Sequence, residues 1–404
     1  MVLNQCPKEY ILETHRSRTP DSTLRFIAAT KESLGLSSFQ DSTDVDRIGL
    51  PVFTTHRIRP DGSRADHAGK GISTIQAQVS ITMEAIERYS AEFRPEDINK
   101  LVKGSYNNLR NDRNVLDPPE LLLSQFTTYN HNDDLYWVRG YDLVKNEDIL
   151  VPACSVYHPF DLDDNFLRAT DTNGLASGNT MEEAVFHGLT ELIERDAWSI
   201  AKFTRAFTDA IVVHDQPDTQ FIIDLIQKFQ SADIQIAAKD ITSDIGVPVI
   251  AVFAQDLIYE GMMLLNGFGA HLDPKAALAR AILEAAQARV MHIQKFGPEG
   301  SRDWVPPYLQ SEEEESEYEP WLYAHEQKNL SELEVGYSQD ILEDIKAVTA
   351  KLQANGLQKI IAVDLTRPEI GIPVVKTIVP GLEVYCFDNT RMGGRLFKSL
   401  SEGD

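Results

Sequence analysis

The chain has 404 residues, and its content of 42% hydrophobic and 25% charged residues is ordinary for a globular protein with a large core. Its formal net charge of −24 argues against nucleic acid or an anionic membrane surface as a partner, because both attract basic proteins. The three cysteines, Cys6, Cys154 and Cys386, are widely spaced, which excludes a disulfide framework or a zinc cluster and predicts a reducing, cytoplasmic location.

Short β-rich segments alternate with amphipathic helices along the chain, which predicts an α/β or α+β fold with mixed sheets and packed helices. Strands are predicted, in chain order, at residues 50–58, 136–143, 149–157, 234–241, 247–255, 262–269, 359–365 and 372–379. Helices are predicted at residues 74–92, 181–204, 219–231, 274–296 and 339–355. Thr180 and Asp273 are the expected N-caps of two helices, with Glu183 completing a capping box and Pro274 in a first turn.

Two polar segments lack this periodicity. Residues 107–132 carry the turn signals NDRN and DPPE, so we expect a surface excursion there. Residues 310–335 are expected to form an acidic loop or insert, because nine glutamates stand against one lysine between positions 311 and 334. The N-terminus has no signal-peptide pattern, and no apolar run reaches the roughly eighteen residues of a membrane helix, so we expect no membrane segment.

Three predicted helices carry oxygen-bearing side chains at helical spacing. The first has Ser80, Glu84, Glu87 and Arg88, the second has Glu191, Glu194 and Arg195, and the third has Glu284 and Gln287. Residues three or four apart share a helix face, so each helix presents two oxygen ligands together. Carboxylates that converge repel one another unless cations lie between them, and Mg²⁺ held by carboxylates and substrate phosphates suits such ligands.

A solvated helix face is the simpler explanation for each motif alone, because exposed Glu-x-x-Glu-Arg patterns usually form weak local ion pairs. In this chain, however, apolar residues such as Ile81, Ile86, Leu192 and Ile193 crowd the first two motifs. Carboxylates that are partly buried need charged partners or metals. The residues therefore leave two alternatives, a solvated face and a metal–nucleotide site built on helix faces.

Other motifs were weighed against this site. His187 shares a helix stripe with Glu191 and Glu194, which leaves a transition-metal site open, although we favour a packing role because Mg²⁺ seldom binds imidazole. The small, glycine-rich residues 173–180 run into a helix N-terminus and form either a phosphate-binding loop or a plain capped turn. No Walker motif, H-E-x-x-H, G-x-S-x-G or kinase signature occurs.

At this point the chain resembles the YcaO family of ATP-dependent enzymes, which activate backbone amides of peptides and proteins. SITMEAIERYS, ASGNTMEEAVFHGLTELIERDAW and GFGAHLDPKAALARAILEAAQAR match the three Glu-rich nucleotide motifs of that family, in order. THRSRTPDSTL, DVDRIGLPVF, AGKGIS and DLTRPEIGIPVVKTIVPGLE are further matching stretches. Together they run from about residue 14 to about residue 398.

The resemblance implies ATP and Mg²⁺ as cofactors, and it assigns roles position by position. Mg²⁺ coordination falls to Glu84, Glu87, Glu191, Glu194 and Glu284, and nucleotide binding to Ser80, Asn179, Glu183, Arg195 and Gln287. Lys70, Arg88 and Arg280 match phosphate or amide contacts, and Arg16 and Ser22 match further ATP contacts. The central catalytic roles fall to Glu84, Glu191, Glu194 and Arg195. The implied organisation is an N-terminal region at 1–64 that contributes to the ATP site and a core at 65–400, with pseudo-duplicated halves around a nucleotide cleft.

The branch of the family follows from the nucleophile. The chain ends in SLSEGD, whereas azoline-forming members typically end in a proline-rich tail, and its N-terminal stretches look most like the archaeal branch that makes thioglycine in methyl-coenzyme M reductase. This resemblance implies thioamidation of a peptide or protein, with the reductase α subunit as substrate and sulfide or a sulfur donor as nucleophile. It also implies a possible TfuA-type partner and a homodimer. An azoline-forming cyclodehydratase and a non-enzymatic metal-binding protein are the alternatives.

Overall fold

The computed structural model describes residues 1–59, 61–162, 167, 170–205, 209–259, 264–299 and 326–401. Contacts divide the chain into two compact units that are interleaved along the sequence. The first unit comprises Met1–Cys6, Ile86–Thr204 and Asp340–Asp404, and the second comprises Pro7–Ala85 and Arg205–Gln339. The division predicted at residues 64 and 65 concerned the nucleotide site, and it stays a prediction.

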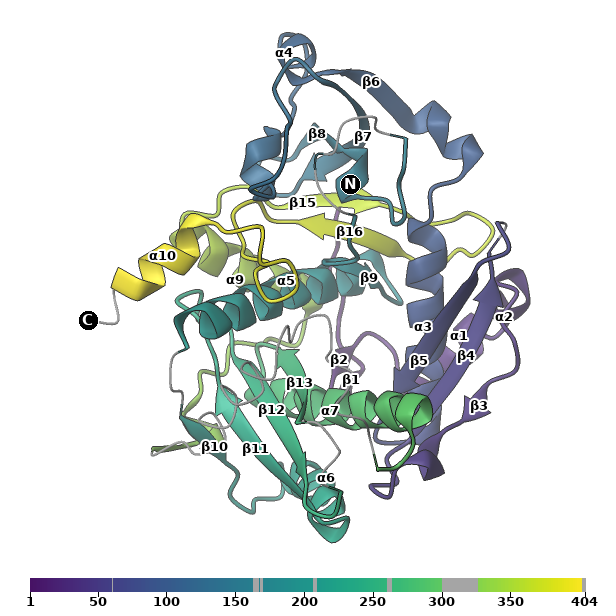
Figure 1. The fold of residues 1–404 in the computed structure, drawn as a ribbon, viewed down its shortest axis with the longest axis vertical. Coiled ribbons are helices and arrows are strands. Elements are labelled where there is room, and N and C mark those ends of the chain that lie inside the picture. The colour runs from purple at the N-terminus through teal and green to yellow at the C-terminus, as the bar shows by residue number, and fades with distance from the viewer. Residues whose placement is uncertain are drawn as a thin grey trace. The chain divides into compact units, whose positions relative to one another are not determined.

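The first unit is built on an antiparallel sheet with the strand order β6-β7-β15-β16-β9, in which β8 also pairs with β7 (Figure 1). Its strands are β6 (Leu101–Ser105), β7 (Asp134–Asp142), β8 (Glu147–Pro152), β9 (Leu175–Ser177), β15 (Ile361–Asp364) and β16 (Val374–Ile378). Its helices are α4 (Tyr106–Leu109), α5 (Met181–Thr204), α9 (Ile341–Ala354) and α10 (Gly394–Ser401). The long helix α5 packs against β9 and β16, so its motif residues lie close to that edge of the sheet.

The second unit holds a five-stranded sheet in the order β13-β12-β11-β10-β14, a three-stranded sheet β3-β4-β5 and the hairpin β1-β2. The strands are β1 (Tyr10–Ile11), β2 (His15–Arg16), β3 (Gln40–Asp41), β4 (Val52–Ile58), β5 (Arg64–Lys70), β10 (Ala210–Val212), β11 (Ile234–Asp240), β12 (Val249–Asp256), β13 (Leu265–Ala270) and β14 (Gln327–Asn329). The helices are α1 (Pro20–Ile27), α2 (Thr30–Ser33), α6 (Gln220–Ser231) and α7 (Pro274–Phe296). Helix α3 (Thr74–Ala91) begins in this unit and ends in the first.

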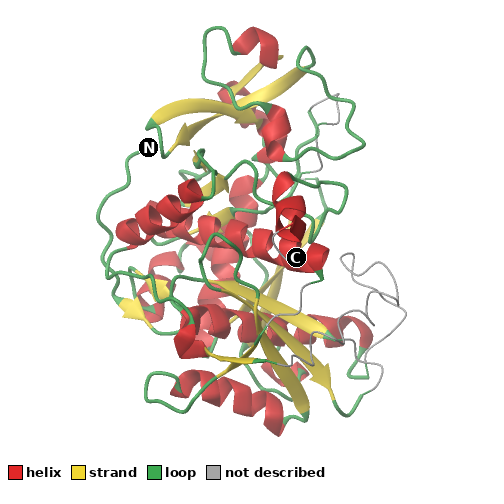
Figure 2. Cartoon of the chain, turned by 90° about the vertical axis from the view of Figure 1, so that its left-hand side faces the viewer, coloured by secondary structure: helices red, strands yellow, loops and turns green. Residues whose placement is uncertain are grey.

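Helix α7 covers one face of the five-stranded sheet (Figure 2). Two glycines of β13 let the helix come close. A Cβ atom built on Gly267 would lie 2.2 Å from the carbonyl oxygen of Ala281, and one on Gly269 would lie 2.1 Å from that of Ala277. No side chain fits in this space, so these positions need glycine. Asp273 caps the helix by accepting from Lys275 N at 3.0 Å, with Pro274 in the first turn. This close packing fixes the distance between the sheet and the helix that carries the third motif.

The mixed α/β fold class is confirmed, and all five predicted helices are present. Three local predictions are wrong. Residues 149–157 were expected to be one strand, but β8 ends at Pro152 and the 3₁₀ turn Ala153–Ser155 follows it. Residues 173–180 contain the short strand β9 rather than a loop alone.

The third correction concerns the acidic segment at 310–335. Residues 310–325 lie outside the described part of the chain, so the expected acidic loop there stays a prediction. Residues 327–332, however, form β14 and the 3₁₀ turn Leu330–Glu332, in which Leu330 is buried in the sheet's core. Within the ranges that the structure describes, we find no helix that is both long and apolar enough to cross a membrane.

Candidate functional site

The first motif lies on α3, where four side chains share a partly buried stripe. Ile81, Ala85 and Ile86 have no solvent exposure and face the interior, so Glu84 and Glu87 emerge between apolar neighbours and are half-buried. Glu87 belongs to the first unit, where its Oε1 accepts hydrogen bonds from Ser177 N at 2.9 Å and from Ser177 Oγ at 2.8 Å. Ser177, at the end of β9, holds a motif carboxylate although no sequence pattern marks it as a site residue.

The second motif occupies one face of α5. Glu194 is only 3% exposed, and its Oε1 lies 4.0 Å from Arg195 Nε. Burial raises the pKa of Glu191, and the charges of Arg195, Lys376 and Arg88 and the backbone N–H of Gly174 counteract part of that rise. Glu191 is half-buried and Glu194 is buried, so the helix face that they share is costly without positive charge nearby, which favours charged partners or a metal over a solvated face.

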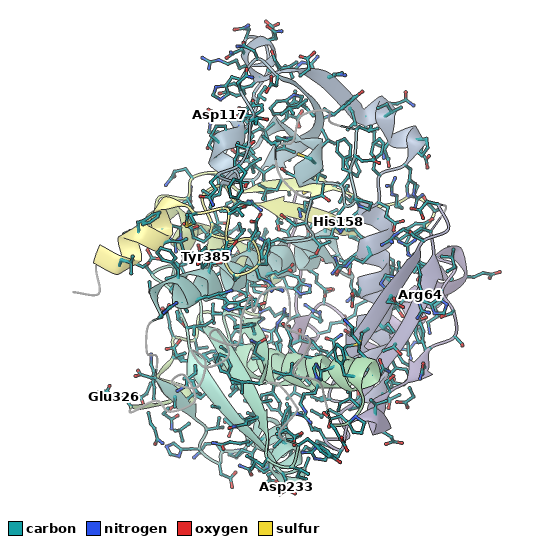
Figure 3. The ribbon with its side chains drawn as sticks, in the orientation of Figure 1. Arg64, Asp117, His158, Asp233, Glu326 and Tyr385 are labelled. Atoms are coloured by element: carbon teal, nitrogen blue, oxygen red, sulfur yellow. The ribbon has the colours of Figure 1, made fainter. Side chains whose placement is uncertain are left out.

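A buried lysine that the sequence analysis missed lies beside this face. Lys376, on β16, is 2% exposed and donates to Asp171 O at 2.9 Å and to Asp171 Oδ1 at 3.2 Å. Burial lowers the pKa of His158, which is labelled in Figure 3, and the charges of Arg88 and Lys376 lower it further. The sequence contains a signal for this residue, because Lys376 stands inside the apolar run IGIPVVKTIVPG, which is typical of a buried strand. A lysine in a buried strand is expected to have a charged or polar partner.

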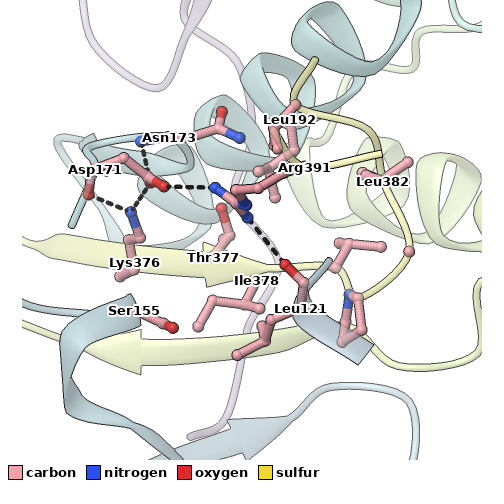
Figure 4. A pocket seen from close by; sticks show the side chains of 14 residues that line it. Leu121, Ser155, Asp171, Asn173, Leu192, Lys376, Thr377, Ile378, Leu382 and Arg391 are labelled. Atoms are coloured by element: carbon pink, nitrogen blue, oxygen red, sulfur yellow. Dashed lines mark hydrogen bonds and ion pairs between the residues drawn. The ribbon is translucent and has the colours of Figure 1, made fainter. Parts of the chain in front are cut away.

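Lys376 lines a small cavity of about 40 Å³ in the first unit, whose wall combines polar and apolar residues (Figure 4). Arg391 reaches the cavity from the C-terminal segment and contacts Asp171 Oδ2 at 3.3 Å, so one carboxylate joins two buried cations. Ser155 Oγ and Asn173 Oδ1 are buried here and have no hydrogen-bond partner among the described residues. A cavity of this size with polar groups in its wall accommodates a few water molecules that would satisfy such groups.

The loop before α5 is braced by its own side chains. Glu183 Oε2 accepts from Asn179 N at 2.7 Å and from Asn179 Nδ2 at 2.9 Å, while Thr180 Oγ1 accepts from Glu183 N at 3.2 Å. The Thr180 cap is therefore confirmed, and Glu183 also reaches back to the side chain and backbone of Asn179. Both Asn179 and Glu183 are buried, so their predicted contacts with a nucleotide remain predictions.

The third motif lies on α7 in the second unit. Glu284 is half-buried, and its Oε2 accepts a hydrogen bond from Lys70 Nζ at 3.0 Å. Arg280 lies one turn before Glu284 on α7, and Gln287 lies one turn after it. Lys70 is the last residue of β5, a strand that precedes the first motif in the sequence. Its contact with Glu284 therefore links that strand to the third motif within the second unit.

The predicted N-terminal contacts belong to the same unit but to other elements. Arg16 is in β2. Burial raises the pKa of nearby Glu13, and the charge of Arg16 counteracts part of that rise. Ser22 is in α1. Its backbone N–H donates to Thr19 Oγ1 at 3.3 Å, so Thr19 caps the helix. Their predicted role in ATP binding stays a prediction.

The predicted metal ligands are divided between the units, with Glu84 and Glu284 in the second unit and Glu87, Glu191 and Glu194 in the first. Among the described residues, no group of three or more His, Cys, Asp or Glu side chains is placed to hold a metal ion. The transition-metal alternative built on His187 therefore gains no support. The donor chemistry does fit Mg²⁺, which usually takes only one or two carboxylates and completes its shell with water and substrate phosphates.

Comparisons with known proteins agree with this chemistry. The family model described as YcaO cyclodehydratase, ATP- and Mg²⁺-binding, matches residues 68–383. An uncharacterized protein of Methanothermobacter thermautotrophicus is 36% identical over 388 residues, which cover 94% of this chain and 98% of that protein. A second relative, described as lying in the tfuA 3′ region of Rhizobium leguminosarum, is 28% identical over 395 residues, which cover 91% of this chain and 89% of that protein.

Solved structures match the fold as well as the sequence. A YcaO protein from Methanopyrus kandleri, bound with AMPPCP and Mg²⁺, aligns with a TM-score of 0.79 and 29% identity over 96% of this chain and 98% of that chain. A heterocyclase in complex with substrate and cofactor has a TM-score of 0.78 at 24% identity, over 95% of this chain and 54% of that chain, and this likeness concerns the fold alone. Because the family model spans well over half of the chain, the chain belongs to the YcaO family of ATP- and Mg²⁺-binding enzymes.

Proposed function

We propose that this protein uses ATP and Mg²⁺ to convert a backbone amide into a thioamide. The observation that carries the proposal is the pair formed by half-buried Glu191 and buried Glu194, with Arg195 beside them, on helix α5 within the span that the family model matches. Arg195, Lys376 and Arg88 already offset part of the negative charge of Glu191, and a Mg²⁺–nucleotide complex would add positive charge for the carboxylates and phosphate oxygens for the arginine. Glu84, Glu87, Glu191, Glu194 and Glu284 are the proposed Mg²⁺ ligands.

The reaction requires an amide oxygen to become a leaving group. Hydrosulfide adds to the carbonyl carbon, and the oxyanion that forms attacks the γ-phosphorus of ATP while the bond to ADP breaks. The C–O bond then breaks to release phosphate, and loss of the thiol proton completes the C=S bond. Bound Mg²⁺ would neutralise phosphate charge. The chain's own task is to place the phosphates, for which Arg195, Arg88 and Lys70 offer cations.

The relatives of this chain support sulfide as the nucleophile. The Methanopyrus YcaO and the Methanothermobacter relative are archaeal, and the Rhizobium relative lies beside tfuA. We therefore propose glycine of a peptide or protein, with the α subunit of methyl-coenzyme M reductase first in line, as the substrate. A TfuA-type sulfur-delivering partner, a homodimer and a cytoplasmic location complete the proposal.

The test is mass spectrometry of a glycine-containing reductase peptide incubated with the protein, ATP, Mg²⁺ and sulfide. We expect a mass gain equal to one oxygen exchanged for sulfur, dependent on ATP. Glu191→Gln should lower the rate by about a hundredfold or more, because a ligand of the phosphate-neutralising cation is lost. Glu343→Gln is the matched control, since Glu343 forms only a surface pair with Lys346 on α9 at 2.8 Å.

Two results would redirect the assignment. Loss of one water from a peptide that contains Cys, Ser or Thr, with no sulfur gained, would make the protein an azoline-forming cyclodehydratase. Equal thioamidation by wild type and Glu191→Gln would remove the carboxylate face of α5 from the mechanism.

A further inference from the structure

Lys70 and Glu284 form a pair that links two motifs of the second unit. Lys70 Nζ lies 3.0 Å from Glu284 Oε2, and the side chains are 24% and 32% exposed, respectively. The residues are 214 positions apart in the sequence. The backbone on the lysine side cannot move easily, because a Cβ on Gly69 would lie 2.2 Å from Ile81 N, so β5 is pressed against α3. The lysine stem, by contrast, has four rotatable bonds, so the ammonium group can change its direction while the strand stays in place.

This contact sets the ammonium group against the proposed role of Glu284. A Mg²⁺ ion lies about 2.0–2.1 Å from a carboxylate oxygen that binds it. An ammonium group at hydrogen-bond distance from the same carboxylate would then be only a few ångströms from a doubly charged ion, and the two cations repel. Glu284 therefore cannot keep both partners at full strength.

We propose that Lys70 is an exchange cation: it neutralises Glu284 while no metal is bound there, and it moves to a nucleotide phosphate oxygen when Glu284 takes a divalent cation. The lysine side chain suits this role, because its ammonium is a compact charge with three donors on a rotatable stem. The inference rests on the proposed function insofar as it assumes that Mg²⁺–ATP binds this chain. It adds a coupling that places the lysine on one partner or the other.

The exchange predicts effects of opposite sign, which separate it from two simpler roles. A purely structural salt bridge would weaken both metal and nucleotide binding when the lysine is removed. A lysine that only binds phosphate would leave metal binding without nucleotide unchanged. An exchange cation competes with the metal and assists the nucleotide, so its removal strengthens the first and weakens the second.

The experiment compares wild type, Lys70→Met, Glu284→Gln and the double variant. Mn²⁺ binding without nucleotide is measured by electron paramagnetic resonance of the free ion, and the Glu284-dependent part is the difference from Glu284→Gln. We expect Lys70→Met to tighten that part about two- to fivefold, the range of a partly exposed ion pair. In calorimetry with Mg²⁺ present, Lys70→Met should bind AMPPCP about tenfold or more weakly than wild type, as expected when a charged hydrogen bond is lost.

Lys275→Met is the matched control, because Lys275 lies on the same helix and pairs with exposed Asp218 at 2.9 Å. It should change neither affinity by more than about twofold. The exchange is wrong if Lys70→Met leaves the Glu284-dependent Mn²⁺ affinity unchanged or lowers it. Failure of wild type to bind AMPPCP would instead refute the proposed function, and the Mn²⁺ comparison would still decide between competition and a structural bridge.

Discussion

At the scale of single residues, His271 shows how tightly the second unit controls charge next to the third motif. The ring is 3% exposed, and its Nδ1 accepts a hydrogen bond from Asp273 N at 2.9 Å, so the proton of the neutral ring is on Nε2. Burial holds the pKa of His271 well below 6.5, and the nearby charges of His15, Arg280, Lys8 and Arg16 lower it further. The neutral ring thus allows the cap of α7 to form.

This histidine gives a prediction about pH. Below pH 6.5 the unfolded chain takes up a proton on His271 that the folded protein does not, so the free energy of unfolding falls as the pH decreases. One such group contributes a slope of up to about 1.4 kcal/mol per pH unit. His271→Asn, whose amide oxygen can accept from Asp273 N, should remove about one proton from the slope in urea denaturation between about pH 6.5 and 5.5. The variant of an exposed histidine, His214→Asn, serves as control, and an unchanged slope in His271→Asn would contradict the assignment.

At the scale of elements, a buried ion network ties α7 to the loop and sheet beneath it. Arg289 has no solvent exposure, and its Nε lies 2.8 Å from Asp46 Oδ2 while its Nη2 lies 2.9 Å from Asp256 Oδ2. Asp256 Oδ1 also accepts from Arg47 Nη2 at 2.7 Å. The DVDRIGLPVF stretch, which the resemblance marked as a family feature, therefore has a structural role as an anchor of the third motif helix.

Removing Arg289 should be far more damaging than removing Arg47. Arg289→Met leaves Asp46 and Asp256 buried with one cation fewer, and we expect a loss of about 3–5 kcal/mol in the free energy of unfolding. Arg47→Met should cost about 1 kcal/mol or less, because the Arg47 side chain is 28% exposed and Asp256 keeps Arg289. Urea titrations followed by circular dichroism measure both. Similar losses in the two variants would mean that the network is not centred on Arg289.

The elements also show what the sequence could and could not predict. Helices α5 and α7 begin and end at the predicted residues because each has a side-chain cap and a long run of residues that favour helix. Strand β5, RADHAGK, was missed because charged and small residues dominate it, and β9 because three residues carry no periodicity. The motif residues were found on helix faces, where spacing along the chain is enough to place neighbours together.

Contacts across the chain lay beyond such spacing. Lys70 and Glu284 are 214 residues apart, and Lys376 and Asp171 are 205 apart, so only tertiary packing brings them together. The same holds for the C-terminal support of α5, where Arg395 Nη2 lies 2.8 Å from buried Asp196 Oδ2 and Cys386 N donates to Ser199 Oγ at 3.0 Å. One-dimensional periodicity predicted which side chains share a helix, while their cationic partners depended on tertiary packing.

At the scale of the whole molecule, the net charge of −24 is the feature that no single site explains. Like charges on one compact chain repel one another, and folding brings them closer than they are in the unfolded chain. Salt shortens the range of this repulsion from about 30 Å at 0.01 M to about 3 Å at 1 M. The buried pairs of Arg289 and Arg395 are screened far less than exposed charges, so salt should relieve repulsion more than it weakens these pairs.

We therefore expect the Tm to rise, by about 2 °C or more, when NaCl is increased from about 0.02 to 0.5 M. Replacing the four glutamates 312–315 by glutamine changes the net charge from −24 to −20, and since self-repulsion scales with the square of the charge, the salt-dependent rise should shrink by roughly 30%. Choline chloride should act like NaCl in calorimetric scans if the cause is screening, whereas bound Na⁺ would make the two salts differ. A Tm that falls with salt would mean that exposed pairs such as Arg64 and Asp66, 2.6 Å apart, outweigh the repulsion and that the acidity carries little folding cost.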